Sequence, residues 1–323
     1  MGFFMSLKKG LDEWLWDFWC LCSLVGIWPR FLEPSLLTTS SVSISIPDLP
    51  KDLTGFKILQ FSDLHWHSAF SRPMLKKLQQ KICSLKPDLI VFTGDLLSKS
   101  HFSETAPLKK FLQSLTAPAG CFVILGNHDY ARYVTLDRDG DYAVETSHLE
   151  SNLNKGLRRL FSTLLPTGNF KESVKEVEEH PELCSLYRET PFRLLKNETL
   201  QITWKQSFLN LTGLEDYMLG RLDPKKAFDG YNPSYPGIVL CHNPDAFPLL
   251  KAYPGDLLLA GHTHGGQVNL PGLWRKFCMI EHPEFKRGLC RLGQKWAYIN
   301  RGIGGLLKFR WFSLPEITLF TLR

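Results

Sequence analysis

The sequence predicts a layered α/β fold, and three observations lead to this prediction. Five short apolar runs with strand-like composition each stop abruptly at a glycine, aspartate, asparagine or histidine. Amphipathic segments with helical spacing separate the first three runs. The chain of 323 residues is long enough to bury one large α/β domain with embellishments. Folds of this class place their chemistry at the carboxyl ends of the strands, so the residues after each run are the candidates for function.

The residues that follow the five runs can bind metal ions. The runs cover residues 58–61, 89–92, 121–125, 238–241 and 257–260. They are followed in order by Asp63 and His65, by Asp95, by Asn127, His128 and Asp129, by His242, and by His262 and His264. Carboxylate and amide oxygens and imidazole nitrogens are hard or borderline ligands, and a set of this kind predicts a two-metal hydrolytic centre.

Two helices should separate the first three strands. Pro73 suits the first turn of a helix that ends at Pro87. We expect Ser103 to cap a second helix, which ends before Pro118. The order strand, helix, strand, helix, strand over residues 56–126 therefore predicts parallel neighbouring strands.

The spacing of the ligand residues predicts how they meet. Asp63 and His65 are two residues apart, so an extended backbone would point both side chains to one side. His262 and His264 repeat this spacing. A carboxylate such as Asp95 can give one oxygen to each of two metal ions and hold them about 3.5–4 Å apart.

The first 33 residues differ in kind from the rest of the chain. Four of the nine tryptophans lie here, flanked by cations. The uncharged stretch, residues 18–28, is shorter than the roughly 20 residues that a bilayer core requires. We expect a helix that lies in the membrane interface; the alternative is a helix whose apolar face docks on the domain itself. Residues 34–55 are rich in serine, threonine and proline and form either a linker or an edge strand.

Charge and cysteine content restrict the partners and the compartment. A net charge of +6 suits an anionic substrate or a membrane surface, and no basic-aromatic tract indicates nucleic acid. The eight cysteines show no paired framework, and Cys83, Cys121 and Cys241 lie in apolar runs, where we expect small buried thiols. The sequence therefore predicts reduced thiols and a catalytic domain that faces the cytosol.

The blocks Asp63-x-His65, Gly94-Asp95, Gly126-Asn127-His128-Asp129, His242 and Gly261-His262-x-His264 resemble the calcineurin-like metallophosphoesterase family over residues 56–323. The resemblance implies a four-layer α/β/β/α sandwich of two mixed sheets. It implies two divalent metal ions, Mn²⁺ in the first place, with Fe, Zn or Mg as alternatives. One ion would be bound by Asp63, His65, Asp95 and His264, and the other by Asp95, Asn127, His242 and His262.

The resemblance also implies a role for two further residues. His128 would sit beside the metal ions without binding them, oriented by Asp129, where it can serve the departing oxygen as a proton donor. The alternative is that His128 only packs against its neighbours.

Details around His242 and at Asn300-Arg301 resemble a bacterial branch of the family with membrane-associated members. This resemblance implies that the chain splits the pyrophosphate of UDP-2,3-diacylglucosamine, giving UMP and 2,3-diacylglucosamine 1-phosphate for lipid A biosynthesis. Such an enzyme would meet its nucleotide-linked lipid at the cytoplasmic face of the inner membrane. The alternative is a membrane-tethered phosphodiesterase or phosphatase with another, possibly soluble, substrate. A non-catalytic, metal-stabilised scaffold is disfavoured because His128 and Asp129 are present.

Residues 132–191 form an insertion that follows the third ligand block, and long loops beside active sites commonly act as lids or specificity elements. An amphipathic helix at residues 153–165 could form an acyl-chain wall, or it could simply pack on the sandwich. The residues expected to meet the substrate are Arg158, Leu160, Phe161, Leu164 and, outside the insertion, Arg301. Residues 217–222 are a second candidate lip of the pocket.

Overall fold

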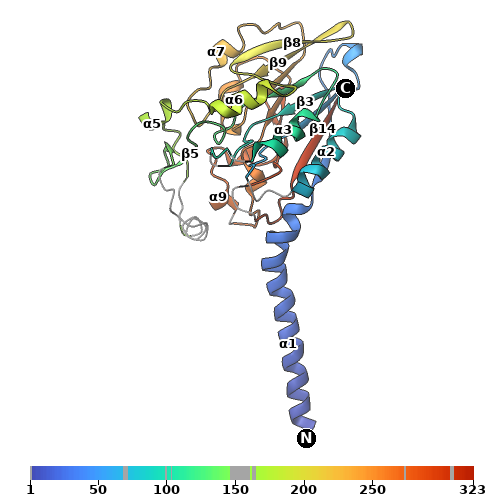
Figure 1. Cartoon of the computed structure of the whole chain (residues 1–323), viewed down its shortest axis with the longest axis vertical. Helices are drawn as coiled ribbons and strands as arrows, with labels where there is room; N and C mark the ends of the chain where they lie inside the picture. Colours follow the sequence, from blue (N-terminus) through green and yellow to red (C-terminus); the bar gives the residue numbers. More distant parts are fainter. Residues whose placement is uncertain are drawn as a thin grey trace.

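Two six-stranded sheets make up the centre of the molecule (Figure 1). The computed structural model describes residues 2–67, 72–98, 100–102, 104–145, 161, 165–272, 274–305 and 309–323. The first sheet has the order β1 (Thr38–Ile44), β14 (Glu316–Leu322), β2 (Lys57–Phe61), β3 (Leu89–Phe92), β4 (Cys121–Val123) and β7 (Phe192–Leu194). The second has the order β12 (Gly288–Leu292), β13 (Lys295–Ile299), β11 (Leu257–Ala260), β10 (Gly237–Leu240), β9 (Ser207–Gly213) and β8 (Glu198–Trp204).

Each sheet is mixed and contains a run of four neighbouring parallel strands. In the first sheet β2, β3, β4 and β7 are parallel, whereas β14 is antiparallel to β2. In the second sheet β13, β11, β10 and β9 are parallel, and β12 and β8 are antiparallel to their neighbours. The predicted parallel pairing of the first three strand runs is confirmed.

Helices cover the outer face of each sheet, so the predicted four-layer α/β/β/α sandwich is confirmed. Side chains alternate along each strand, and Ile58 packs between the two sheets whereas Leu59 packs under the helices of the first sheet. Those helices are α2 (Arg72–Leu85), α3 (Thr105–Gln113) and α6 (Pro181–Arg188). The outer face of the second sheet is covered by α7 (Pro224–Ala227) and α8 (Phe247–Leu250).

The two predicted helices are present, with one correction. Helix α2 has the predicted bounds and buries Leu75, Leu78 and Ile82. Helix α3 begins at Thr105, so its N-cap is Glu104, whose side chain makes no capping hydrogen bond. Ser103, the predicted cap, lies outside the described residues.

The N-terminal helix α1 (Gly2–Ile27) projects away from the sandwich (Figure 1). Between Trp14 and Ile27, its described large apolar side chains are exposed, including Trp14 at 60%, Trp16 at 67% and Trp19 at 62%. The alternative in which this helix docks its apolar face on the domain is therefore wrong. Among the described residues, no helix has the length and the apolar character needed to cross a membrane.

The segment after α1 belongs to the domain. Residues 34–55 contain β1, which pairs in parallel with β14 from Thr38 to Ile44, so the edge strand and not the linker is present. Glu33, just before this segment, is buried. Short helical turns complete the chain at Trp28–Leu32, Glu33–Ser35, Lys51–Leu53, Pro244–Ala246, His264–Gly266, Trp274–Phe277 (α9) and Pro283–Phe285.

The described part of the insertion begins with a hairpin of β5 (Val134–Leu136) and β6 (Tyr142–Val144). The ammonium nitrogen of Lys171 lies 2.9–3.7 Å from carboxylate oxygens of the three aspartates in the turn of this hairpin, Asp137, Asp139 and Asp141. A short helix, α5 (Glu172–Lys175), then leads to α6. The helix expected at residues 153–165, with Arg158, Leu160 and Leu164, falls outside the described residues, apart from Phe161 and Leu165, which are exposed.

All eight cysteines are free, and the reduced state stays a prediction. Cys121 and Cys241 are buried as predicted. Cys83 is exposed, because the helix α2 turns it away from the face that packs on the sheet.

Candidate metal centre

The carboxyl ends of strands from both sheets meet at one place. Asp63 follows β2, Asp95 follows β3 and Asn127 follows β4, all in the first sheet. From the second sheet, His242 follows β10, and His262 and His264 follow β11. These side chains and His65 are buried, except His262, which is half-buried. The fold therefore gathers seven polar side chains that are far apart in the sequence.

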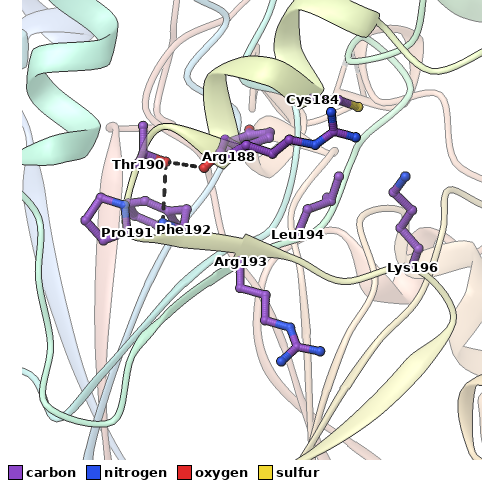
Figure 2. Close-up of a pocket in the computed structure, with 9 residues that line it drawn as sticks. Cys184, Arg188, Thr190, Pro191, Phe192, Arg193, Leu194 and Lys196 are labelled. Atoms are coloured by element: carbon purple, nitrogen blue, oxygen red, sulfur yellow. Dashed lines mark hydrogen bonds between the residues drawn. The ribbon is translucent and has the colours of Figure 1, made fainter.

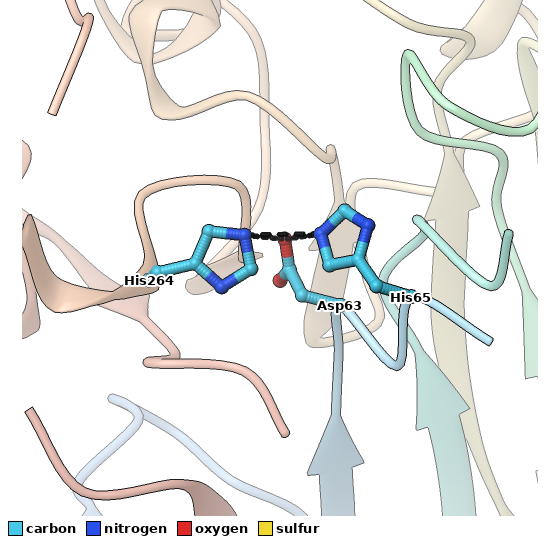
Figure 3. A group of neighbouring side chains, drawn as sticks. All are labelled: Asp63, His65 and His264. Atoms are coloured by element: carbon cyan, nitrogen blue, oxygen red, sulfur yellow. Dashed lines mark hydrogen bonds and ion pairs between the residues drawn. The ribbon is translucent and has the colours of Figure 1, made fainter. Parts of the chain in front are cut away.

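Asp63, His65 and His264 form one group of possible ligands (Figure 3). The carboxylate oxygen Oδ1 of Asp63 lies 3.9 Å from His65 Nε2 and 3.6 Å from His264 Nε2. The two imidazole nitrogens face each other at 3.0 Å. Since a divalent cation among these atoms would interact favourably with all three, the donor set fits a metal ion.

Asp95, Asn127, His242 and His262 form a second group. Asp95 Oδ2 lies 3.2 Å from His242 Nε2, which lies 3.3 Å from His262 Nδ1. The side-chain oxygen of Asn127 is 3.1 Å from the same His262 nitrogen. This group has the same mixture of oxygen and nitrogen donors as the first and also fits a divalent cation.

Asp95 connects the two groups through a single oxygen. Its Oδ2 lies 3.6 Å from His65 Nε2 in the first group and 3.2 Å from His242 Nε2 in the second. Its other oxygen, Oδ1, accepts a hydrogen bond from the backbone N–H of His128 at 2.9 Å. Oδ2 is therefore the oxygen that faces both groups, and the expected arrangement with one oxygen for each metal ion stays a prediction.

The ligand side chains converge because their backbone is left-handed. The φ angles of Asp63, His65, Asp95, His262 and His264 lie between 47° and 67°. The expectation of an extended backbone at the paired ligands was wrong, although the spacing selected residues that do meet. Such conformations cost about 1–3 kcal/mol each and persist where the surrounding structure imposes them, often at functional sites.

Glycine allows the closest approach within the centre. A Cβ atom on Gly126 would lie 2.3 Å from Asp95 Oδ1 and 2.7 Å from His242 Nε2. Any other residue at this position would have to displace ligand atoms. The Gly126-Asn127 step therefore brings the first sheet close to a histidine of the second.

Hydrogen bonds hold several ligand atoms in the form that binds metal. His65 Nδ1 donates to the carbonyl oxygen of Leu97 at 3.2 Å, and His242 Nδ1 donates to that of Thr93 at 2.7 Å. Because a carbonyl can only accept, the neutral form of each ring keeps its lone pair on Nε2. Burial favours this neutral form at His65 by lowering its pKa, whereas Asp95 raises the pKa of His242 well above its ordinary value against the effect of burial, so a metal ion would have to displace a proton there. The side-chain amide nitrogen of Asn127 donates to the carbonyl oxygen of Val134. This hydrogen bond turns the side-chain oxygen of Asn127 toward His262.

Burial shapes the protonation of the centre. It raises the pKa of Asp63 to about 7 and lowers the pKa of His65 to about 4 and of His262 to about 3. Burial alone would raise the pKa of Asp95, but His242 and His128 beside it hold that pKa well below its ordinary value. A cation would stabilise this centre, because it binds neutral imidazoles and offsets the unfavourable charge of a buried carboxylate.

His128 packs at the edge of this centre. Its ring stacks on Tyr133 with centroids 4.5 Å apart and meets the ring of His65 edge-on at 4.9 Å. One of its nitrogens lies within 4.8 Å of ligand atoms of His65 and Asp95. The distances alone would allow His128 to bind metal, so its role outside the ligand set stays a prediction.

Asp129 acts on the loops of the centre. Its Oδ2 accepts the backbone N–H of Asp95 at 2.7 Å and of Gly126 at 3.1 Å, and its Oδ1 accepts that of Leu97 at 2.9 Å. Both oxygens of this buried carboxylate therefore bind the loops after β3 and β4 to each other. The expected task of orienting the His128 ring stays a prediction.

A cleft opens directly beside the two groups. Five of its lining residues, Asp95, Asn127, His128, His262 and His264, belong to the metal centre. The others are Thr135, Leu136, Met218, Thr263, Gln267, Cys278, Met279 and Ile280. Leu136 comes from the insertion and Met218 from the segment proposed as a second lip. The wall at 278–280 was missed, because a short mixed segment far along the chain carries no periodic signal.

Two arginines near the centre have structural tasks. The guanidinium of Arg301, expected to bind substrate, donates to Glu316 at 3.0 Å and to Thr38 at 3.2 Å, so it faces the sheet edge. Arg310, which the sequence did not suggest, is buried and donates to the carbonyls of Arg301, Gly302 and Ser313. Its Nη2 also lies 3.4 Å from His264 Nδ1.

A second cavity lies between α6 and β7 (Figure 2). It is lined by Cys184, Tyr187, Arg188, Thr190, Pro191, Phe192, Arg193, Leu194 and Lys196. Two of its cations have carboxylate partners, with Arg193 3.2 Å from Glu198 and Lys196 2.6 Å from Glu179. None of the proposed metal ligands lines this cavity, so we assign the chemistry to the cleft at the strand ends.

Comparison with known proteins identifies the family of the chain. UDP-2,3-diacylglucosamine pyrophosphatase LpxG of Chlamydia muridarum is 40% identical over 308 residues, which cover 92% of each chain. The protein of the same name from Chlamydia trachomatis is 39% identical with the same coverage. Phosphodiesterase YaeI of Escherichia coli is 27% identical over 83% of this chain and 82% of its own. The family model for calcineurin-like phosphoesterases matches residues 56–266 and, with the ligand clusters, implies divalent metal ions. The chain therefore belongs to the calcineurin-like phosphoesterase family.

Proposed function

We propose that the chain hydrolyses the pyrophosphate bond of UDP-2,3-diacylglucosamine, giving UMP and 2,3-diacylglucosamine 1-phosphate for lipid A biosynthesis. The observation that carries the proposal is the cleft, in which a cluster of metal-binding side chains faces an apolar wall of Leu136, Met218, Met279 and Ile280. Such a cleft suits a substrate that joins a phosphate group to acyl chains. The chlamydial relatives, aligned over 92% of this chain, carry that substrate in their name.

The residues divide the work in this proposal. Asp63, His65, Asp95 and His264 would hold one divalent ion, and Asp95, Asn127, His242 and His262 the other. Bound there, the ions would supply charge stabilisation for the phosphoryl group and an activated water molecule. His128, at the rim of both groups, would hold a proton for the departing oxygen. We propose Mn²⁺ because the mixture of carboxylate, amide and imidazole donors suits an ion of intermediate hardness.

We also propose that the enzyme works at the cytoplasmic face of the inner membrane, held by α1. The exposed tryptophans of this helix support a position in the interface, where aromatic side chains are favoured. Washing isolated membranes with high salt should leave the protein bound, whereas deletion of residues 2–27 should release much of it, because salt screens charge but does not weaken apolar burial. Release of the full chain by salt would refute an inserted apolar helix.

The activity is tested with the purified full chain in detergent. UDP-2,3-diacylglucosamine should be cleaved to a nucleoside monophosphate and a lipid monophosphate in the presence of Mn²⁺, and a chelator should abolish the reaction. Identification of both products by mass spectrometry checks which bond is broken. A chain that cleaves only small phosphodiesters would contradict the lipid substrate.

A phosphodiesterase with a soluble substrate is the second candidate function. The similarity to a bacterial protein named as a phosphodiesterase favours it, at 27% identity. Assays with cyclic nucleotides and aryl phosphodiesters in parallel with the nucleotide-linked lipid discriminate between the two, because only the lipid requires the apolar wall.

A further inference from the structure

Aromatic and basic side chains surround the point where α1 joins the domain. We call this group the collar and define it as Phe31, Trp274, Arg275, Arg287, Trp311 and Phe312. Phe31 is 63% exposed and Phe312 is 59% exposed, and both arginines are exposed as well. The face of the domain beside α1 therefore presents aromatic surface and positive charge together.

The collar is tied to the end of the N-terminal helix. The carboxylate of Glu33 accepts hydrogen bonds from the backbone N–H groups of Phe312 and Ser313 and from the indole nitrogen of Trp28. The backbone N–H of Arg310 donates to the carbonyl of Pro29 at 2.8 Å. Residues 28–33 are thus clamped to the loop that carries Trp311 and Phe312, so the direction of α1 and the position of the loop are coupled.

The other side of the same loop is tied to the segment that contains α9. The backbone N–H of Asn269 donates to the carbonyl of Trp311 at 2.8 Å, and Arg287 donates to that of Phe312 at 3.1 Å. The Lys286 ammonium lies 4.0 Å from the centroid of the Trp274 ring. The collar is consequently one connected surface, although its members come from three separate parts of the sequence.

The chemistry of the collar matches that of a membrane interface. Tryptophan and phenylalanine are favoured at the level of the lipid headgroups, and arginine is attracted to anionic lipid. The nearby carboxylates of Glu33 and Glu316 are buried and hydrogen-bonded within the domain, so they do not offset the exposed arginines. The surface is also continuous with α1, whose described large apolar side chains between Trp14 and Ile27 are exposed.

We propose that the collar docks on the surface of an anionic lipid bilayer and holds the catalytic domain against it. The segment from 267 to 280 gives this docking a consequence for the active site. Gln267 and Cys278–Ile280 line the cleft at the metal centre, and the residues between them include Trp274 and Arg275 of the collar. A docked collar therefore turns the mouth of the cleft toward the lipid. This inference rests on the membrane location under the proposed function, and it adds a second contact besides α1.

The test compares matched variants of the full chain by co-sedimentation with lipid vesicles. Phe312→Asn removes the exposed ring, and asparagine tolerates the φ of 55° at this position. Arg275→Glu reverses one exposed charge. The controls are Phe208→Asn, on a ring that is 36% exposed in β9, and Lys225→Glu in α7, both at the end of the domain opposite α1 (Figure 1).

On vesicles of phosphatidylcholine and phosphatidylglycerol, the partition coefficient should fall about tenfold for Phe312→Asn. It should fall by a similar factor, about tenfold, for Arg275→Glu. On pure phosphatidylcholine only the Phe312 effect should remain, because no anionic headgroup is present. Both control variants should bind as the unchanged protein does. Hydrolysis of the lipid substrate in detergent reports separately on the integrity of each variant and on the proposed activity.

Binding by Phe312→Asn and Arg275→Glu that equals that of the unchanged chain would overturn the collar and leave α1 as the membrane contact. Equal losses in the collar and control variants would also overturn it. If the collar instead binds a second copy of the chain, the collar variants would change the oligomeric state without changing the partition onto vesicles. This result would also contradict the proposal. None of these results depends on whether UDP-2,3-diacylglucosamine is the substrate, which the detergent assay decides independently.

Discussion

Replacing Asp129 with asparagine should loosen the metal centre as well as slow its chemistry. The two carboxylate oxygens accept three backbone N–H groups, those of Asp95, Gly126 and Leu97. An asparagine keeps one acceptor, and its best orientation serves Asp95 and Gly126. Its amide nitrogen then faces the N–H of Leu97, donor against donor, in a fully buried position.

The size of the effect follows from these contacts. Losing a hydrogen bond to a charged group costs about 1.5–3 kcal/mol, and a buried donor left unpaired adds about 1–3 kcal/mol. We therefore expect a loss of about 3–5 kcal/mol in the free energy of unfolding. With an unfolding entropy of about 2.1 cal/mol/K per residue, a chain of 323 residues should then lose about 4–7 °C in Tm.

The assay is thermal unfolding of the metal-loaded protein, with metal content measured after dialysis. It belongs at about pH 8, because burial raises the pKa of Asp129 to about 7 and the carboxylate must be charged. Asp88→Asn is the matched control, since Asp88 accepts one backbone N–H, that of Lys57, at 2.8 Å at the other end of the strands. An asparagine can keep that single bond, so Tm and metal content should change little.

The opposite pattern would refute this account of Asp129. If Asp129→Asn kept the Tm and both metal ions but lowered kcat, the carboxylate would act on the His128 ring and not on the loops. The same result in Asp88→Asn and Asp129→Asn would show that the number of accepted hydrogen bonds does not matter.

Three further predictions concern the metal centre and its cleft. Asp95→Ala should abolish activity and lower the metal content of both groups, whereas His128→Ala should keep the metal ions and slow turnover by a factor of about 10²–10⁴. Elemental analysis measures the metal content, and an equal loss of metal in both variants would show that His128 is a ligand. Gly126→Ala should lower the free energy of unfolding by about 1–3 kcal/mol and reduce metal content, because its Cβ would lie 2.3 Å from Asp95 Oδ1. If denaturant unfolding and metal content are both unchanged, the loop that carries Gly126 can move enough to accommodate the methyl group. Met279→Ser should slow hydrolysis of the diacylated substrate and leave hydrolysis of an aryl phosphodiester unaffected. The loss should grow with acyl length, since each buried methylene contributes about 0.8 kcal/mol. Equal losses of activity on both substrates would indicate that Met279 has a structural role.

The sequence by itself determined the strands and the residues at their ends. Apolar runs such as 89–92 and 257–260 are buried on both faces of a parallel sheet, so they carry a strong local signal and end where the chain meets solvent or a reaction centre. Proline at residues 73 and 87 delimited α2 for local steric reasons. The types of residue at the strand ends were therefore sufficient to predict a metal centre and its family resemblance.

Only the tertiary structure decided how those residues act. Asp63 and His65 converge through left-handed backbone that the loops impose, and the two sheets approach closely enough for His242 to meet Asp95 only because Gly126 lacks a side chain. Asp129 became a clamp for two loops, Arg301 turned to Glu316, and Arg310 was buried beside His264. Strand signals are local, because they lie in consecutive residues. These roles instead depend on contacts between segments about 200 residues apart or more, such as Asp63 with His264, which no local pattern records.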